Sequence, residues 1–328
     1  MINYDLVIIG GGIAGLSAAI KAKEEGVNSI LLLEREEQLG GSLSNYIDAD
    51  FSYPLIDEAL TGPEVIQIYV DKIKEHNIEF KLNCLVIDVN KDKIITTVTE
   101  EGIKEYKAKA IILAMGSREM PRGAINILGS RTAGIFTAAS AQKFVNLEGY
   151  LPGKQVLIIG SGDLGLVMAK RLTLEGAIVK AVVEPLKHAV GTEKNIEQCL
   201  DIFNIPLKLG YTVIDIKGKE RVQGVVVAKS DENNIPITNT EENISCDTIL
   251  ISANFLPENE ISVKAGVLLS SADGGAIVDD NMQTNIEGIF ACGDVLYIHD
   301  YREDVTGEGI KAGQSAALYI KEEIAEKQ

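Results

Sequence analysis

Apolar runs alternate along the chain with segments of helical periodicity, which is typical of parallel strands covered by helices. The first run, residues 5–9, leads into a glycine turn and a helical segment, and the next apolar run ends in Glu34. The same order of strand, glycine turn, helix, strand and acid starts again at Val156 and ends at Glu184. The pattern predicts an α/β fold that is built twice.

Both glycine turns have the spacing GxGxxG, and the second lies 150 residues after the first. The glycines are Gly10, Gly12, Gly15, Gly160, Gly162 and Gly165. The first glycine of such a motif allows a tight turn, the second lets the backbone approach a pyrophosphate, and the third lets the helix pack on the strand. In both halves the acid follows the first glycine by 24 residues, where it can bond ribose hydroxyls. The repeat predicts two dinucleotide-binding domains.

The composition is that of a globular protein, with 46% hydrophobic and 24% charged residues among 328. The formal net charge of −17 argues against a nucleic-acid binder, which needs a basic face, and against attachment to anionic lipid. No apolar run approaches the ~20 residues of a membrane helix. The first strand has no basic region ahead of it, so we expect no signal peptide and a cytoplasmic location.

The four cysteines and three histidines show no metal-type spacing. None of the cysteines lies within three residues of another, so the chain contains no CxxC. We therefore expect neither a zinc site nor a Cys–His nucleophile.

Residues 284–294 form a turn, a short apolar run and then Gly293-Asp294. This segment resembles the C-terminal flavin signature of the FAD/NAD(P)-linked pyridine nucleotide-disulfide oxidoreductase superfamily. Residues 110–116, an apolar strand with a small-residue turn, resemble a second element of that superfamily, and residues 247–254 are a degenerate copy of it. Asn254 replaces the usual glycine of the copy, and asparagine tolerates the left-handed backbone of such a turn.

The resemblance covers essentially the whole chain. It implies an α/β fold of two Rossmann-like, three-layer ββα dinucleotide-binding domains, with the second inserted in the first. The FAD-binding domain would comprise residues 1–118 and 258–328, and the NAD(P)-binding domain residues 119–257. The length leaves no room for the C-terminal dimerisation domain of the glutathione-reductase branch, so the layout is similar to that of thioredoxin reductase.

The resemblance also implies which residues bind each cofactor. In the family, the aspartate of the flavin signature bonds the ribitol chain of FAD, a role that falls to Asp294 here. The residues expected to bind FAD are Gly10, Gly12, Ile13, Ala14, Gly15, Glu34, Arg35, Gly41, Ser42, Val86, Ala114, Met115, Gly116, Gly293 and Asp294. Those expected to bind NAD(H) are Gly160, Ser161, Gly162, Asp163, Leu164, Gly165 and Glu184.

The remaining periodicity fits this family. A helix is expected at residues 63–76, and a C-terminal helix at residues 305–325. The β-rich segments that suggest the family's β-meander on top of the nucleotide sheet are residues 85–89, 94–98 and 106–108, with residues 222–228 as their match in the second half.

The second acid indicates which nicotinamide nucleotide is bound. Glu184 can bond both ribose hydroxyls of NADH and would repel the 2′-phosphate of NADPH. No arginine pair follows it to receive that phosphate. NADH is therefore favoured, although Lys187 leaves NADPH open.

Both positions at which the family carries a redox disulfide lack cysteine. These stretches are residues 134–141 and residues 39–46. Thiolates are the nucleophiles of thiol–disulfide exchange, so we expect no intrinsic disulfide reductase activity. Cys292 lies beside the flavin signature without a partner and is expected to be a small packing residue.

Residues 144–154, together with residues 160–176, are similar to the flavoprotein subunits of dehydrogenases and oxidases that act on opines, sarcosine, proline or glycine, and to NAD(FAD)-dependent dehydrogenases. This resemblance implies an electron-transfer subunit with a partner dehydrogenase or iron–sulfur subunit; a homo-oligomer is also compatible. Two other hypotheses stay open: a stand-alone NADH oxidase or diaphorase, and a non-catalytic flavin redox sensor. Cofactors carry hydride transfer, so no side chain is nominated as catalytic.

Three further residues give weaker signals. His299 is interpreted as an exposed loop histidine, with a place near the flavin as the alternative. Arg118 and Arg122 lie at the crossover between the domains, where they would brace the chain or bind a phosphate.

Overall fold

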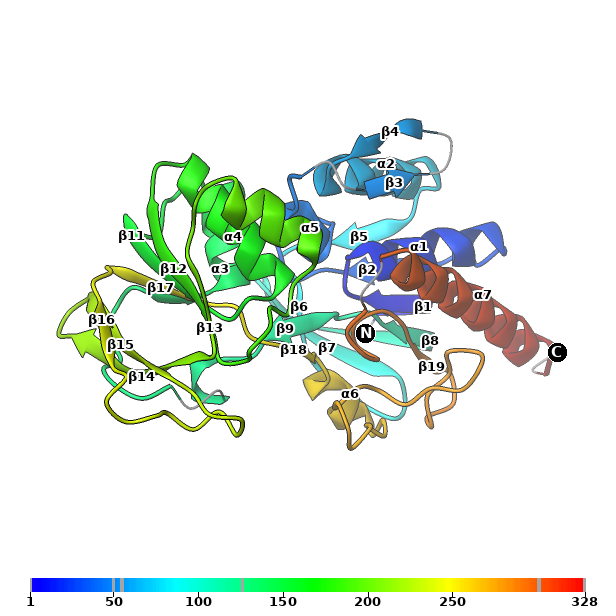
Figure 1. The fold of residues 1–328 in the computed structure, drawn as a ribbon. Helices are drawn as coiled ribbons and strands as arrows, with labels where there is room; N and C mark the ends of the chain where they lie inside the picture. Colours follow the sequence, from blue (N-terminus) through cyan, green and yellow to red (C-terminus); the bar gives the residue numbers. More distant parts are fainter. Residues whose placement is uncertain (1, 49–50, 54–55, 125–126, 300–301, 327–328) are drawn as a thin grey trace. The chain divides into compact units, whose positions relative to one another are not determined.

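The computed structural model describes residues 2–48, 51–53, 56–124, 127–299 and 302–326 (Figure 1). The chain divides into two compact units. Unit 1 is Met1–Arg118 with Phe255–Gln328, and unit 2 is Glu119–Asn254. Unit 1 is therefore assembled from both ends of the chain, while unit 2 is one continuous segment. The second boundary precedes the predicted one by the short strand β18 (Phe255–Pro257).

A seven-stranded sheet forms the centre of unit 1, with strand order β5-β2-β1-β8-β7-β6 and with β19 paired on β8. The pairs of β5 with β2, β2 with β1, β1 with β8 and β8 with β19 are parallel, whereas β6, β7 and the first half of β8 pair antiparallel. The strands are β1 (Ile2–Ile9), β2 (Ile30–Leu33), β5 (Glu79–Lys81), β6 (Leu85–Val89), β7 (Ile94–Thr99), β8 (Gly102–Leu113) and β19 (Ile289–Ala291).

Strand β8 joins two elements that the sequence predicts as separate. Its first half pairs antiparallel with β7 and closes the β-meander, and its second half pairs parallel with β1. Buried residues alternate with more exposed ones from Glu105 to Lys109, and residues 110–113 are all buried. The meander is therefore joined to the nucleotide sheet through β8, a strand that the two share.

Helices and meander cover opposite faces of this sheet. Leu6 and Ile8 of β1 pack with the helices, whereas Val7 and Ile9 pack on the face of the meander. The helices of unit 1 are α1 (Ile13–Glu24), α2 (Gly62–Glu75), α6 (Glu260–Ala265) and α7 (Arg302–Glu326). A short hairpin, β3 (Phe51–Tyr53) with β4 (Ile56–Leu60), completes the unit, together with β9 (Ser117–Glu119), which pairs with β18.

Helix α7 lies along α1, so the last helix of the chain packs on the first (Figure 1). Two glycines make this close approach possible. A Cβ atom on Gly309 would lie 2.4 Å from the carbonyl oxygen of Ala14, and one on Gly313 would lie 2.3 Å from that of Ala18. Both chain ends therefore contribute to one packed layer.

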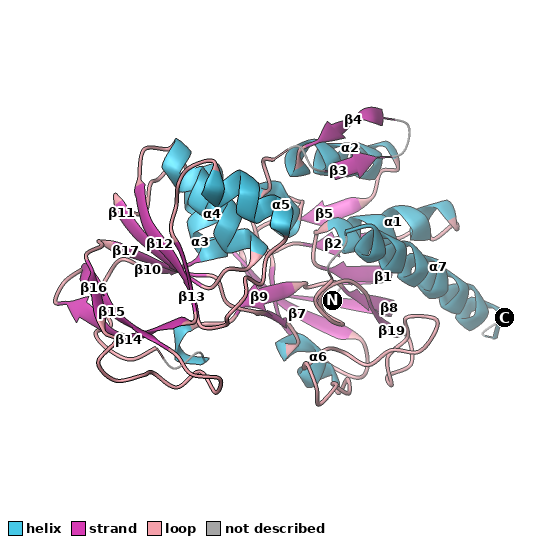
Figure 2. Cartoon of the chain, in the orientation of Figure 1, coloured by secondary structure: helices cyan, strands magenta, loops and turns pink. Residues whose placement is uncertain are grey.

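Unit 2 has a parallel sheet with strand order β10-β17-β11-β12-β13 (Figure 2). Ile158 of β11 packs with α3 and α4 on one face, and Leu157 packs with a three-stranded antiparallel sheet on the other. The elements are β10 (Ile135–Thr137), α3 (Ala138–Asn146), β11 (Gln155–Ile159), α4 (Asp163–Leu174), β12 (Ile178–Glu184), α5 (Glu193–Ile196), β13 (Leu207–Leu209), β14 (Tyr211–Gly218), β15 (Val222–Lys229), β16 (Glu242–Ile244) and β17 (Thr248–Ile251). The predicted fold class, α/β with two three-layer ββα units of which the second is inserted in the first, is confirmed.

The turn after β17 differs from the expectation. Asn254 has no positive φ, so the left-handed turn expected there is not formed. Ser252 makes the contact that links this strand to the glycine turn: its N–H donates to the oxygen of Ile159 at 2.7 Å, as Ala114 donates to Ile9 at 2.8 Å in unit 1.

Candidate cofactor sites

The first glycine turn follows β1 and is closed by glycines that admit no side chain. Gly10 has φ +107°, and a Cβ atom on it would lie 2.2 Å from the carbonyl oxygen of Ala114. A Cβ on Gly15 would lie 1.9 Å from the oxygen of Gly10. The turn therefore packs against the end of β8, as the motif requires. Met115 and Gly116 follow in the chain and are partly exposed beside this turn.

The helices that follow the two glycine turns begin without a side-chain cap. Helix α1 begins after Gly12 and α4 after Gly162, and neither start has a side-chain acceptor. In contrast, Thr61, Thr137 and Thr192 accept a backbone N–H at the starts of α2, α3 and α5. The uncapped N–H groups and the positive end of the helix dipole make both starts suited to an anion such as a pyrophosphate.

Space is available where such an anion would approach in unit 1. The nearest atom to a Cβ built on Gly12 is the Cα of Gly41, at 3.9 Å. Gly41 belongs to a loop that is fixed by a hydrogen bond from the N–H of Gly40 to the oxygen of Gly11, at 2.8 Å. Ser42 is exposed in the same loop, and Ile13 and Ala14 are buried in the first turn of α1.

Glu34 lies at the end of β2, beside the glycine turn, and is only 6% exposed. Its carboxylate accepts hydrogen bonds from the N–H of Gly11 at 2.7 Å and of Glu36 at 2.9 Å. A carboxylate has about four lone-pair positions, so acceptor capacity remains for ribose hydroxyls. The Arg35 side chain is 55% exposed, and its Nε atom lies 3.8 Å from Oε1 of Glu36. Val86 is buried in β6.

Unit 2 repeats this arrangement around Glu184, which is 4% exposed. One carboxylate oxygen accepts from the N–H and the hydroxyl of Ser161, and the other accepts from the N–H of Leu186 at 3.0 Å. The N–H of Gly191 donates to the oxygen of Ser161 at 2.8 Å, which matches the contact of Gly40 in unit 1. The repeat in the sequence is therefore also a repeat in hydrogen bonding.

The other predicted NAD residues have separate positions. Gly160 has φ +93° and lies against the oxygen of Ser252, and Gly165 packs on the side chain of that serine. Leu164 packs on the core of unit 2. Asp163 is exposed and accepts from the N–H of Thr192 at 2.8 Å, so it fixes the segment after β12 beside the turn.

The Gly-Asp pair near the C-terminus lies at the start of α1. Strand β19 pairs with β8, and Gly293 follows with φ +79°. A Cβ atom on Gly293 would lie 2.9 Å from the Cβ of Ala14. Asp294 is partly exposed and accepts from the Ser117 hydroxyl at 3.3 Å. Residues from both ends of the chain thus meet at one glycine turn.

Sequence reasoning was wrong about His299. Its side chain is only 2% exposed and lies between two carboxylates, those of Asp294 and Glu308. No local pattern indicates this burial, because the two partners precede and follow the loop. The rings of Tyr297 and His299 stack with their centroids 4.1 Å apart.

The arginines and Lys187 make local contacts. Arg122 donates to the carbonyl oxygens of residues 127–130, so it braces that loop. Arg118 pairs with Glu258 and Glu260 at 3.7 and 3.3 Å. Lys187 lies 3.5 Å from Glu232, and both are well exposed.

All four cysteines are free and buried: Cys84, Cys199, Cys246 and Cys292. Burial raises the pKa of the Cys246 thiol to about 11, and it raises the pKa of Cys84 and Cys292 as well. A raised pKa disfavours the thiolate, which is the nucleophile of disulfide exchange. The stretches that match the family's disulfide positions form β10 with the start of α3 and the short helix Gly41–Asn45.

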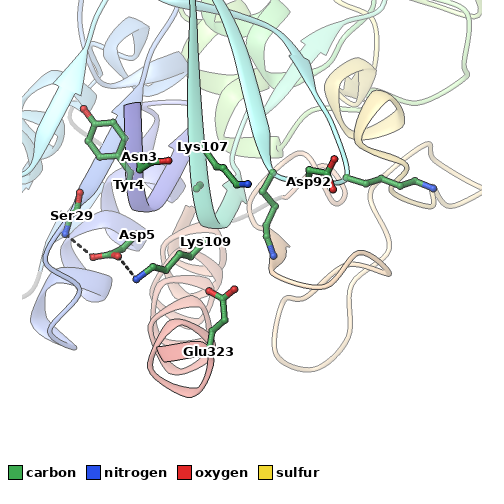
Figure 3. A pocket seen from close by; sticks show the side chains of 11 residues that line it. Asn3, Tyr4, Asp5, Ser29, Asp92, Lys107, Lys109 and Glu323 are labelled. Carbon is green, nitrogen blue, oxygen red and sulfur yellow. Dashed lines mark hydrogen bonds and ion pairs between the residues drawn. The ribbon is translucent and has the colours of Figure 1, made fainter. Parts of the chain in front are cut away.

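A cavity of about 550 Å³ lies elsewhere in unit 1, at the N-terminal ends of β1 and of the parallel half of β8 (Figure 3). Lysines and acids both line it, and Lys109 pairs with Asp5 at 2.8 Å. None of the predicted cofactor residues lines this cavity. In the described residues, no group of three His, Cys, Asp or Glu side chains is arranged to hold a metal ion. Among those residues, no helix is both long and apolar enough to span a membrane.

Comparisons with known proteins agree with this geometry. The model of the family described as pyridine nucleotide-disulphide oxidoreductase matches residues 4–317. The chain is 26% identical over 325 residues to thioredoxin reductase of Bacillus subtilis, which covers 97% of this chain and 95% of that protein. It is 25% identical over 332 residues to ferredoxin–NADP reductase of Picrophilus torridus, with 99% and 95% covered. The crystal structure of Lactococcus lactis thioredoxin reductase matches with a TM-score of 0.77 and 25% identity, over 97% of this chain and 99% of that one.

Proposed function

Because the chain belongs to the pyridine nucleotide-disulphide oxidoreductase family and is an oxidoreductase, we propose that it binds FAD in unit 1 and NAD(H) in unit 2 and transfers hydride between them. The observation that carries this proposal is the repeated site: an uncapped helix start, a glycine turn and a buried acid in each unit. Two such sites fit two dinucleotides.

Unit 1 is proposed as the FAD unit because it alone carries the Gly-Asp pair beside its glycine turn. Gly293 lies against Ala14, which places Asp294 close to the start of α1. The carboxylate of Asp294 is partly exposed and suited to accept hydrogen bonds from the hydroxyls of a ribitol chain.

When bound, the two cofactors supply the hydride chemistry. The chain binds and orients them. The N–H groups at the starts of α1 and α4 would bind the pyrophosphates, and Glu34 and Glu184 would accept from the ribose hydroxyls. No side chain is required to move a proton.

NADH is proposed over NADPH. The buried carboxylate of Glu184 would lie beside the ribose, where a 2′-phosphate would meet its negative charge. Lys187 is the nearest cation in the sequence, and it already lies beside Glu232. An exposed ion pair contributes little free energy, so the pairing of Lys187 with Glu232 adds little to the preference for NADH.

We also propose that the chain has no disulfide reductase activity of its own and passes its electrons to a partner subunit. Its cysteines are buried, and burial raises the pKa of three of the thiols. The ferredoxin–NADP reductase named above shows that relatives of this length are not all named for a disulfide substrate.

A matched pair of variants tests the two cofactor sites separately. Gly12→Asp and Gly162→Asp each place a carboxylate where a pyrophosphate would approach, and neither glycine has a positive φ. Gly12→Asp should abolish FAD binding. Gly162→Asp should keep about one FAD per chain and lose reduction of the flavin by NADH. A folded wild-type chain that binds no FAD in excess cofactor would contradict the proposal.

Turnover separates the electron-transfer subunit from the other hypotheses. The isolated wild-type chain should have its flavin bleached rapidly by NADH and then turn over only with an artificial dye. Sustained turnover with oxygen or a quinone would favour a stand-alone oxidase or diaphorase. Failure of NADH to reduce the flavin would favour a redox sensor.

A further inference from the structure

Three ionisable side chains, those of Asp294, His299 and Glu308, form a cluster at the Gly293-Asp294 turn. The Nδ1 atom of His299 lies 3.0 Å from Oδ1 of Asp294, and its Nε2 atom lies 3.0 Å from Oε1 of Glu308. The His299 side chain is 2% exposed, and that of Glu308 is 13% exposed. The imidazole therefore bridges the loop after β19 to helix α7.

The cluster is tied to the turn by further contacts. Oε2 of Glu308 accepts from the N–H of Gly293 at 2.8 Å, and Oδ1 of Asp294 lies 3.4 Å from the N–H of His299, which donates to it. The ring of Tyr297 stacks on the imidazole, and its hydroxyl donates to Glu308 at 3.2 Å. Backbone, ring and carboxylate contacts together fix where His299 lies.

A positive charge is what this cluster needs. Two carboxylates flank one imidazole, and Nε2 has no well-aligned hydrogen-bond acceptor among the described residues, so its contact with Glu308 is electrostatic. Burial lowers the pKa of His299, and the carboxylates of Glu308 and Asp294 outweigh it, so that the pKa is raised overall. If the imidazole is neutral, the two carboxylates lie near each other without a cation between them.

We propose that His299 is a positioning residue of the FAD site, which fixes the carboxylate of Asp294 for the cofactor through its bridge to Glu308. The proposal rests on the FAD site proposed above. In this role His299 acts on the cofactor through Asp294.

A dependence on pH follows. Below the raised pKa of His299, the imidazolium holds Asp294 in place and FAD binds tightly. As pH rises through that pKa, the charge is lost, Asp294 is released and FAD affinity falls. The described groups that face or adjoin His299 are Asp294, Tyr297 and Glu308, with Asp304 acting on Tyr297 and Cys292 buried beside Glu308. The thiol and the phenol have raised pKa values and stay neutral over this range.

The experiment measures FAD affinity by flavin fluorescence from about pH 6 to about pH 9. Wild-type affinity should fall about tenfold across this range, because a charged hydrogen bond is lost. His299→Gln should bind FAD about tenfold more weakly at the acidic end and show a flat profile. His76→Gln, at the end of α2, is the matched control and should keep the wild-type profile.

A double-mutant cycle separates positioning from a general structural role. In an Asp294→Asn background, His299→Gln should change FAD affinity by less than about twofold, because its effect is transmitted through that carboxylate. An equal loss in both backgrounds would overturn the proposal, as would a wild-type pH profile in His299→Gln. If wild type binds no FAD, the proposed function fails instead.

Glu308→Gln keeps the inference testable if His299→Gln does not fold. This variant retains an acceptor for the N–H of Gly293 and removes one of the two negative charges at the imidazole. The pH at which FAD affinity falls should then move to lower values. The bridge also exists in the apoprotein, without any cofactor. The pH at which the melting temperature of the apoprotein falls should therefore also move to lower values. An unchanged midpoint in both measurements would overturn the proposal.

Discussion

Ser161 donates two hydrogen bonds to the carboxylate of Glu184, one from its backbone N–H at 2.9 Å and one from its hydroxyl at 2.8 Å. In unit 1 the equivalent acid, Glu34, receives a single bond from Gly11. The Ser161 hydroxyl also accepts from the N–H of Val190 at 2.9 Å. The acid of unit 2 is thus fixed by a side chain as well as by backbone, and it is joined to the loop after β12.

Removing this acid should change the choice of nucleotide. Glu184→Ala should weaken the binding of NADH more than that of NADPH, since it removes the ribose contact and the repulsion of a 2′-phosphate together. A hydrogen bond to a charged group contributes about 1.5–3 kcal/mol, so the preference should shift by roughly tenfold or more. Stopped-flow reduction of the bound flavin by each nucleotide measures it.

Ser161→Ala is the control for that experiment, because it removes the hydroxyl and keeps the carboxylate. This variant should weaken the binding of NADH and of NADPH by similar factors. Equal effects of Glu184→Ala on NADH and NADPH would show that Glu184 does not contact the ribose.

Two glycines of α7 should respond in opposite ways to the same substitution. Gly309→Ala places a Cβ atom 2.4 Å from the carbonyl oxygen of Ala14 and should destabilise the protein by about 1–3 kcal/mol. Gly307→Ala meets no atom within 4 Å and should stabilise it by about 0.5–1 kcal/mol, because alanine favours the helix. Urea unfolding compares them, and a Gly309→Ala variant as stable as Gly307→Ala would mean that α7 does not pack on α1 as described.

Replacing all four cysteines should leave NADH-dependent flavin reduction nearly intact. Some stability is lost, because a serine hydroxyl in apolar packing costs about 1–3 kcal/mol. The reduction rate is therefore measured on the folded fraction. A thiolate-to-flavin charge-transfer band in the wild type that Cys292→Ser abolishes would instead indicate a thiol-based mechanism.

Glu119 should make stability depend on pH. One of its carboxylate oxygens accepts from the N–H of Ala139 at 2.7 Å, and the other is buried without a partner among the described residues. Burial raises the pKa of this carboxyl, although the hydrogen bonds at the start of α3 lower it. The protonated carboxyl of Glu119 therefore contributes stability to the folded protein below the pKa that this group has in the unfolded chain. This stability is lost as pH rises through its pKa in the folded protein.

Glu119→Gln should therefore have a higher melting temperature than wild type at neutral pH, with the difference disappearing in acid. Glu148→Gln, on an exposed carboxylate, provides the comparison. A wild type that is the more stable of the two at neutral pH would show that the hydrogen bonds at α3 outweigh burial.

The local elements could be predicted because their signals are local. Periodicity placed the helix at residues 63–76, which is α2, and the structure adds a Thr61–Glu64 capping box that was not predicted from the sequence. The strand segments 85–89 and 94–98 are β6 and β7. The continuity of β8 could not be seen, because the change from one buried face to two occurs within a single strand.

The contacts across the fold had no such signal. The burial of His299 depends on α7 lying over the loop after β19, and the bond from Ser161 to Glu184 depends on how two strands of one sheet end side by side. The GxGxxG spacing predicts the glycine turns. The residue after the first glycine, Gly11 or Ser161, decides whether a side chain bonds the acid in addition to the backbone. Whether the predicted residues bind FAD and NAD(H) stays a prediction.

The assembly of unit 1 from both chain ends sets an order for biosynthesis. A ribosome makes β1 and α1 before unit 2, and it makes β19 and α7, which pair with β8 and pack on α1, only after unit 2. Unit 2 has its complete sequence while unit 1 still lacks β18, α6, β19 and its longest helix, α7. The nascent chain therefore exposes the face of α1 that α7 later covers, and the Gly-Asp pair reaches the first glycine turn only after unit 2 has been made.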